Sequence, residues 1–336
     1  MLNQNVNVGG QAVIEGVMIR SDKYISVAVR KPDGKIALKR EENQPWGKRL
    51  KILRIPLIRG AVILIESLIH GIKALTWSAE VAVEEEDNEK SNGSAQSKNS
   101  WKLKLSTFIS ITFALAMGLL LFFWLPIVFT NWVGVETGFA FNIIDGIFRL
   151  LMFGLYLGLI SMWKEIKRIF QYHGAEHKSI YAYGNNCPLT VAGARPFSTL
   201  HPRCGTSFLL IVMIVSILVF MFLGKPETFI DYITRLSFVP LIGGISYEFT
   251  RLSGRYKDNR IARIFILPGL WLQKITTREP SDDQLDVGLI ALRSAIGEII
   301  DMDNVIHYDG NGIIRTVDTS TKASQDENVL FSSPDN

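Results

Sequence analysis

The apolar residues of this chain are concentrated in four long stretches after residue 104. These stretches run roughly over residues 105–130, 143–163, 206–224 and 229–250. A helix needs about 20 residues to cross the ~30 Å hydrocarbon core of a bilayer, and each stretch approaches or exceeds that length. The third is the most apolar, whereas the fourth contains Asp231, Arg235 and Pro240. The pattern predicts a domain of about four transmembrane helices over residues 105–250.

The residues before these stretches follow other patterns. The β-branched runs AVIEGVMIR and YISVAVR, with the turn signal KPDGK, predict a small β-rich domain over residues 1–55. Over residues 56–83, polar side chains recur at helical spacing on an otherwise apolar sequence. This spacing predicts an amphipathic helix at the membrane interface. Residues 84–104 are mostly charged or polar and are predicted to be a disordered linker.

The C-terminal part is predicted to lie outside the bilayer. Within residues 251–308, the segment IARIFILPGLWLQKI is short and is broken by Pro268, and the segment DDQLDVGLIALRSAIGEII begins with acidic residues. Both features are typical of cytoplasmic or interfacial helices. Residues 309–336 form a polar tail. We therefore expect a mainly α-helical membrane protein with about four transmembrane helices, amphipathic interfacial helices and a small N-terminal β-containing cytoplasmic domain.

Basic residues predict the orientation of the chain, because they are enriched in cytoplasmic loops. The loop between the first two predicted spans has no lysine or arginine. The loop over residues 164–205 contains Lys164, Lys167, Arg168, Lys178, Arg195 and Arg203. The alternation predicts that this loop and both termini are cytoplasmic. The expected location is the bacterial cytoplasmic (inner) membrane, with several passes.

Composition restricts the class of protein and its partners. Hydrophobic residues make up 48% of the 336 residues and the mean hydropathy is +0.20, which fits membrane spans combined with polar parts. The net charge of +4 is small and dispersed, which argues against a nucleic-acid ligand and fits a lipid bilayer as partner. The two cysteines do not make a disulfide framework, so a reducing compartment is expected.

His173, Glu176 and His177 form the first candidate site. Two histidines four residues apart lie on one face of a helix, where they can share a metal ion. The order H-x-x-E-H is found in inverted zincins, in which the histidines bind zinc and the glutamate activates water. Those enzymes take a third ligand from a distant glutamate, and Glu248 is a candidate for it. The alternatives are an ordinary helix end near lipid headgroups and, for Glu248, a pair with Arg251.

A second candidate group directly precedes the third predicted span. His201 and Cys204 are three residues apart, and imidazole and thiolate are ligands that suit zinc. The predicted topology places this pair and the first group at the same membrane face. The alternative is a helix start at His201 with Cys204 as a packed thiol.

Three further residues are candidates for a site-facing position. Glu66 and His70 are four residues apart on the predicted amphipathic helix and could reach the same membrane face. A solvated polar stripe is the alternative for this pair. Glu15 lies in the apolar run AVIEGVM and is flanked like a buried or site-facing acid, but nothing in the sequence decides its role.

Several segments resemble a known bacterial family. They are GGQAVIEGVMIR, PLIRG, QYHGAEHKSIYAY, FSTLHPRCGTSFLLIVMIVSILVF and LPGLWLQKITTREPSDDQLDVGLIAL. They are similar to the YqhQ-like multi-pass membrane proteins of unknown function, which are labelled predicted metal-dependent enzymes. The likeness covers nearly the whole chain apart from residues 84–100 and the tail. It implies a multi-pass membrane protein and places both candidate metal groups in the family's signature segments.

The leading hypothesis is a membrane-embedded metal-dependent enzyme, a hydrolase that acts on a membrane-associated substrate at the cytoplasmic face. His173 and His177 would bind zinc, with His201, Cys204 or Glu248 completing the site and Glu176 as general base. The alternative is a non-enzymatic scaffold, assembly factor or transporter-like protein with a structural metal site and a membrane-protein or lipid-linked partner. Ion permeation is less favoured, because the central halves of the first three spans carry almost no ionisable groups.

Overall fold

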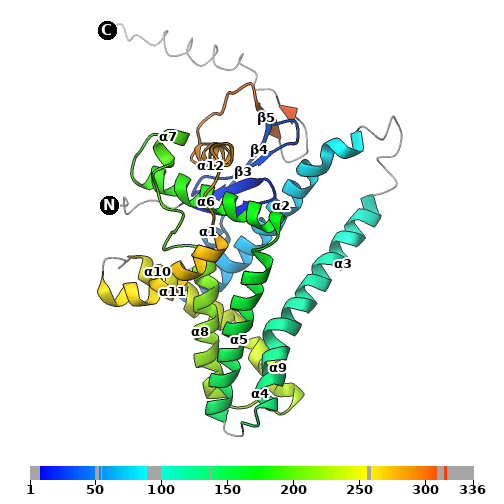
Figure 1. The fold of residues 1–336 in the computed structure, drawn as a ribbon, viewed down its shortest axis with the longest axis vertical. Coiled ribbons are helices and arrows are strands. Elements are labelled where there is room, and N and C mark those ends of the chain that lie inside the picture. The colour runs from blue at the N-terminus through cyan, green and yellow to red at the C-terminus, as the bar shows by residue number, and fades with distance from the viewer. Residues whose placement is uncertain are drawn as a thin grey trace.

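The computed structural model describes residues 8–49, 53, 55–88, 100–135, 138–255, 259–308 and 314–315. It has a sheet flanked by helices at one end and a bundle of long helices extending away from it (Figure 1). Most of the predicted linker and of the polar tail lies outside the described residues. The described ends of the linker belong to helices.

A six-stranded sheet follows the order of the sequence. Its strands are β1 (Gly9–Val13), β2 (Gly16–Arg20), β3 (Tyr24–Arg30), β4 (Ile36–Glu42), β5 (Val305–Tyr308) and β6 (Ile314–Arg315). Neighbouring strands are antiparallel except for the parallel pair of β4 and β5, in which Ile36 is the partner of Val305. The predicted KPDGK turn joins β3 to β4, and Gly34 provides its positive φ of 84°. The N-terminal strands are therefore extended by residues from the opposite end of the chain.

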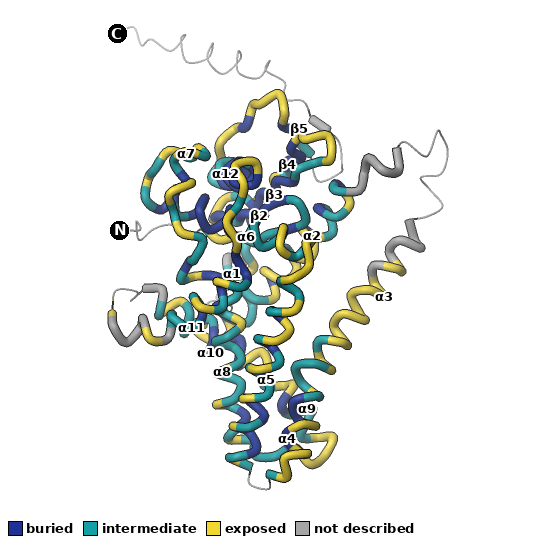
Figure 2. The backbone as a smooth tube through the Cα atoms, in the orientation of Figure 1, coloured by how far each residue is buried: buried dark blue, intermediate teal, exposed yellow. Residues whose placement is uncertain are grey.

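Helices cover both faces of this sheet, because its strands carry apolar side chains on both. Val17 and Ile19 of β2 pack with residues of α6 (Lys164–Gly184) and α12 (Asp282–Ala295). Met18 points to the opposite face, where α2 (Ile58–Asn88) contributes Ala74 and Val81. Figure 2 shows the buried residues concentrated in this sandwich. The predicted N-terminal strands are present, and later helices complete their core.

The remaining helices form the bundle and the connections. They are α1 (Trp46–Arg49), α3 (Ser100–Leu119), the π-helical turn η2 (Leu120–Trp124), α4 (Leu125–Trp132), α5 (Gly138–Ile160), α7 (Val191–Ala194), α8 (Gly205–Leu223), α9 (Phe229–Ser237), α10 (Val239–Arg255) and α11 (Arg260–Thr276). Among the described residues, three helical segments are long and apolar enough to cross a membrane, Phe108–Trp132, Gly138–Ile160 and Gly205–Leu223. In the most apolar part of each segment, at most 22% of the residues are buried inside the protein, as expected for a lipid-facing helix.

The stretch predicted as a fourth span forms two helices, α9 and α10, and neither meets the criteria for a membrane-crossing helix. Asp231 belongs to a capping box with Thr228 that starts α9. Pro240 occupies the first turn of α10, where proline is tolerated. The prediction of one continuous fourth span is therefore not confirmed, because its polar residues begin shorter helices. Helix α10 instead packs against α2 and α8.

The contact between α2 and α10 depends on a close backbone approach. A Cβ atom added to Gly244 of α10 would lie 2.4 Å from the carbonyl oxygen of Leu57, at the start of α2. A Cβ atom added to Gly60 would lie 2.8 Å from Cα of Gly244. Both distances are shorter than any side chain tolerates, so small residues are required on both helices.

We expect Gly244→Ala to lower the melting temperature of the detergent-purified protein by several degrees, corresponding to about 1–3 kcal/mol, because α10 must move away from α2. Gly154→Ala in α5 is the matched control, since its added Cβ would meet no atom within 4 Å. It should leave stability unchanged or raise it, as alanine favours helix over glycine. Equal melting temperatures for Gly244→Ala and wild type would contradict the described α2–α10 contact.

Candidate metal centre

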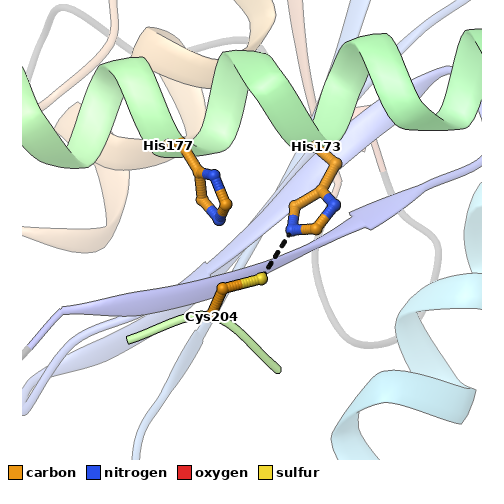
Figure 3. A group of neighbouring side chains, drawn as sticks. All are labelled: His173, His177 and Cys204. Atoms are coloured by element: carbon orange, nitrogen blue, oxygen red, sulfur yellow. Dashed lines mark hydrogen bonds between the residues drawn. The ribbon is translucent and has the colours of Figure 1, made fainter. Parts of the chain in front are cut away.

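Three metal-ligating side chains converge where α6 meets the start of α8. His173 and His177 lie one turn apart on α6, and Cys204 is the N-cap residue of α8. One ligand atom from each lies within 4.8 Å of the other two. Nε2 of His173 is 3.2 Å from Sγ of Cys204, and both imidazoles point from α6 toward the cysteine (Figure 3). His177 and Cys204 are buried, at 1% and 4% exposure, so the group is largely shielded from solvent.

Backbone carbonyls fix the tautomer of both histidines. Nδ1 of His173 lies 2.8 Å from the carbonyl oxygen of Thr276, and Nδ1 of His177 is hydrogen-bonded to the carbonyl oxygen of Thr199. A carbonyl oxygen can only accept, so each Nδ1 carries a proton and donates it. In this tautomer the lone pair of each ring is on Nε2. This is the arrangement in which protein histidines usually bind metal ions.

Cys204 provides the third donor atom of the group. Its sulfur accepts a hydrogen bond from the backbone N–H of Thr206 at 3.4 Å, at the positive end of the α8 dipole. Nε2 of His173 lies 3.2 Å from this sulfur. Two neutral imidazoles and one thiolate form a donor set that suits zinc. The residues present therefore fit a divalent metal with three protein ligands.

His201 lies beside this group but does not belong to it. Its ring contacts the rings of His177 and Tyr181, at centroid distances of 5.4 and 4.8 Å. Its Nδ1 accepts a hydrogen bond from the backbone N–H of Arg203 at 3.2 Å, so the lone pair of this nitrogen is not available to a metal. The side chain of Gln273 bonds both backbone groups of His201 at 2.8 Å. His201 therefore packs against a ligand and holds the loop before α8.

Glu176 is buried on the neighbouring side of α6, beside strand β1. A Cβ atom added to Gly10 would lie 2.9 Å from Cγ of Glu176, and the Gly10 backbone hydrogen-bonds to the carboxylate. Burial raises the pKa of Glu176 to about 7, against the opposing effects of His173 and of the Gly10 hydrogen bond. Its carboxylate is not among the three converging ligands. The structure thus places it near His173 but directed toward the sheet.

Glu248 is held by an ion pair away from the three ligands. Nη2 of Arg59 lies 2.5 and 2.7 Å from the two carboxylate oxygens of Glu248, which joins α2 to α10. Arg251, one of the partners considered from the sequence, is farther away at 3.7 Å. Glu248 does not join the converging group.

Glu66, His70 and Glu15 are also separate from the three ligands. Glu66 is buried, pairs with Arg20 at 2.9 Å, and lines with His70 a cavity of about 670 Å³ between β1, β2, α2 and α10. This part of the predicted polar stripe therefore faces a cavity. Glu15, at the turn between β1 and β2, has a positive φ of 52° and pairs with Arg168 of α6. It ties the sheet to the helix that carries the histidines.

Sequence reasoning missed the groups that position the ligands. The carbonyls of Thr199 and Thr276 are backbone atoms, and no side-chain pattern indicates their role. Lys178, counted above as a basic loop residue, is buried and donates to the carbonyl oxygen of Arg195 at 2.7 Å and to Glu279. The signal that could have indicated this is its position on the apolar face of an amphipathic helix.

Comparison with known proteins identifies relatives without a known function. A family model described as "Protein of unknown function (DUF1385)" matches residues 55–298. The uncharacterised protein YqhQ of Bacillus subtilis (strain 168) is 33% identical over 290 residues, covering 84% of this chain and 89% of the relative. No solved structure matches the chain. The resemblance noted in the sequence is thereby confirmed.

Glu176 gives the chelator-treated protein a defined pH dependence. Its folded-state pKa of about 7 lies above the usual 4.5, so the folded state binds the proton more tightly than the unfolded state. The resulting stabilisation is full below pH 4.5 and is lost as the pH rises through about 7. We expect Glu176→Gln to exceed wild type in melting temperature at pH 8 and to lose this advantage at low pH. A constant difference across that range would contradict the burial of an ionisable carboxyl.

Proposed function

Because the chain belongs to the DUF1385 family, whose function is unknown, we propose its function from its own geometry. It is a membrane-embedded metal-dependent enzyme, a hydrolase that acts on a membrane-associated substrate at the cytoplasmic face of the bacterial inner membrane. The observation that carries this proposal is the convergence of His173, His177 and Cys204 within 4.8 Å. Three ligands are the usual number at a catalytic zinc, which keeps one position for water or substrate, whereas structural zinc sites use four.

The position of Cys204 supports a site at the membrane surface. This residue caps α8, whose residues Gly205–Leu223 form a candidate membrane span. The three ligands therefore lie at the end of a span, where a lipid-linked or membrane-anchored substrate can reach them. The six basic residues around this loop favour the cytoplasmic side.

Each residue of the site has a role in the proposal. His173 and His177 hold the metal through Nε2, and the carbonyls of Thr276 and Thr199 keep the rings oriented. Cys204 supplies an anionic ligand. A divalent metal bound there provides Lewis acidity toward a carbonyl or phosphoryl oxygen and lowers the pKa of water. Glu176 remains the proposed general base, since its carboxyl is buried beside His173, and this role requires it to turn from Gly10 toward the substrate.

One observation favours a non-enzymatic alternative. His173 and His177 belong to a helix that packs on the sheet, whereas Cys204 starts a helix of the bundle. A metal held by all three would join the two parts of the molecule. The protein would then be a scaffold, an assembly factor or a transporter-like protein with a structural metal site and a membrane-protein or lipid-linked partner.

Metal analysis of the detergent-purified protein tests whether the site binds metal. We expect wild type to contain about one equivalent of zinc and His173→Ala, His177→Ala and Cys204→Ala each to lose it, because three ligands share one ion. His307→Ala and Cys187→Ala are matched controls that should keep the metal. His307 hydrogen-bonds the carbonyl oxygen of Ile300 in the sheet, and Cys187 follows α6. A metal-free wild-type protein would refute the proposal.

Cobalt substitution separates the enzyme from the structural alternative. An enzyme with an exchangeable position should change its cobalt d–d spectrum when azide is added, whereas a closed site should not. Glu176→Gln should keep the metal and lose about 10²–10⁴-fold in hydrolysis of chromogenic esters and phosphodiesters presented in mixed micelles. The structural role would be favoured if azide left the cobalt spectrum unchanged and the wild-type protein hydrolysed none of the esters and phosphodiesters tested.

A further inference from the structure

A group of buried charges lies inside the apolar helix bundle. Asp145 and Arg149 lie on α5, and Arg235 lies on α9, with exposures of 2%, 7% and 1%. Arg149 occupies the middle of α5, so the expectation that the central halves of the spans lack ionisable groups fails for this helix. Charged groups inside apolar spans are costly and usually mark functional sites.

The two arginines gather around one aromatic ring of α8. The guanidinium carbons of Arg149 and Arg235 lie 5.4 and 4.9 Å from the centroid of Phe220. Nη2 of Arg235 donates to Oδ1 of Asn142 at 2.8 Å and to the carbonyl oxygen of Gly224 at 2.5 Å. Three helices therefore bring both guanidinium groups to one place.

The group carries an excess of positive charge. Asp145 is its one carboxylate, with Oδ2 2.9 Å from Nη2 of Arg149, and it also lies within electrostatic reach of Arg235. Two guanidinium groups and one carboxylate leave a net charge of +1. Asp231, the acid nearest in sequence to Arg235, is half-buried and interacts electrostatically with Arg235, but it caps the start of α9 and does not belong to the fully buried group. A net charge in an apolar interior is unfavourable unless an ion of opposite sign compensates it.

Hydrogen-bond donors of the same group are unsatisfied. Among the described side chains, Nε and Nη2 of Arg149 and Nη1 of Arg235 are buried and have no hydrogen-bond partner. Nη2 of Arg149 forms an ion pair with Oδ2 of Asp145 at 2.9 Å, and Oδ1 of Asp145 is also buried without a hydrogen-bond partner. Buried donors normally find acceptors, so unsatisfied guanidinium N–H groups indicate a missing acceptor. This observation is independent of the charge imbalance and points to the same ligand chemistry.

A helix distortion adjoins the group. The π-helical turn η2 interrupts the α3–α4 span and places Phe123 with its ring centroid 5.4 Å from the guanidinium carbon of Arg149. The adjacent Phe122 packs against Phe153 and Tyr156 of α5. Single π-helical turns inside helices are frequently found at functional sites.

We propose that Arg149 and Arg235 form a binding site for a small monovalent anion, such as chloride, inside the helix bundle. The unsatisfied N–H groups supply its ligands, and one negative charge neutralises the group. The anion must be small, because the protein itself already encloses all three charged side chains almost completely. Phe220 and Cys204 are sixteen residues apart on α8, or about 24 Å at 1.5 Å per residue. The anion site is therefore separate from the metal centre and does not depend on it.

Chloride-35 NMR of the full-length protein in detergent tests the proposal. The chloride line should broaden on addition of wild-type protein in a background of sodium gluconate, and added bromide should reverse the broadening saturably. Wild-type protein that causes no saturable, bromide-sensitive broadening would overturn the proposal. This measurement needs no variant, so it decides even where a substitution prevents folding.

Charge variants then locate the site. Arg149→Gln and Arg235→Gln should weaken chloride binding roughly tenfold or more, as expected for the loss of a charged hydrogen bond. Asp145→Asn raises the net charge to +2 and should tighten binding. Arg195→Gln is the matched control, because its exposed ion pair with Asp282 lies outside the bundle. Binding that is unchanged in both folded arginine variants would place the chloride elsewhere and overturn the assignment.

Discussion

The structure depends on a sheet whose two faces are both apolar. Val17 and Ile19 alternate with Met18 along β2, so each face of the sheet carries apolar side chains. If either face were uncovered, these side chains would be exposed to water. Helix α2, which follows these strands closely in the sequence, covers only one of the two faces. The other face takes α6 and α12 from distant parts of the chain. Because α6 must lie against the sheet, its histidines are brought to a fixed place beside the start of α8.

The second requirement is that the buried polar groups at this junction find partners. The buried Lys178 would be costly alone, and it is satisfied by the carbonyl of Arg195 and by Glu279. Gln273 of α11 likewise satisfies both backbone groups of His201. These bonds fix the loop before α8, the end of α11 and the segment that follows it. The same segments present the carbonyls that orient the histidines, so the ligand geometry follows from the folding of the junction.

Part of this arrangement could be predicted from the sequence, because it depends on local spacing. The four-residue separation of His173 and His177 and the position of Cys204 before an apolar run identify these three residues as candidate ligands, but the same reasoning also includes His201 and Glu248, which lie outside the converging group. Contacts between distant segments leave no such signal. The parallel pairing of β5 with β4 could not be predicted, because the sequence of a short strand after a helix does not indicate which strand it pairs with. Asp145 and Arg149 have i, i+4 spacing, but the strongly apolar stretch around them predicts only a membrane span.

The pairing of β4 with β5 also constrains the order of biosynthesis. Strands β1 to β4 leave the ribosome first, but β5, α6 and α12 follow the first two apolar spans, and β5 and α12 follow all three. The sheet therefore cannot be completed until all three candidate spans have been synthesised. During this interval an apolar strand surface remains without its cover, which is the condition under which nascent chains aggregate. Efficient production of this protein thus requires that the uncovered face of β1 to β4 be protected until α6, α12 and β5 have been translated.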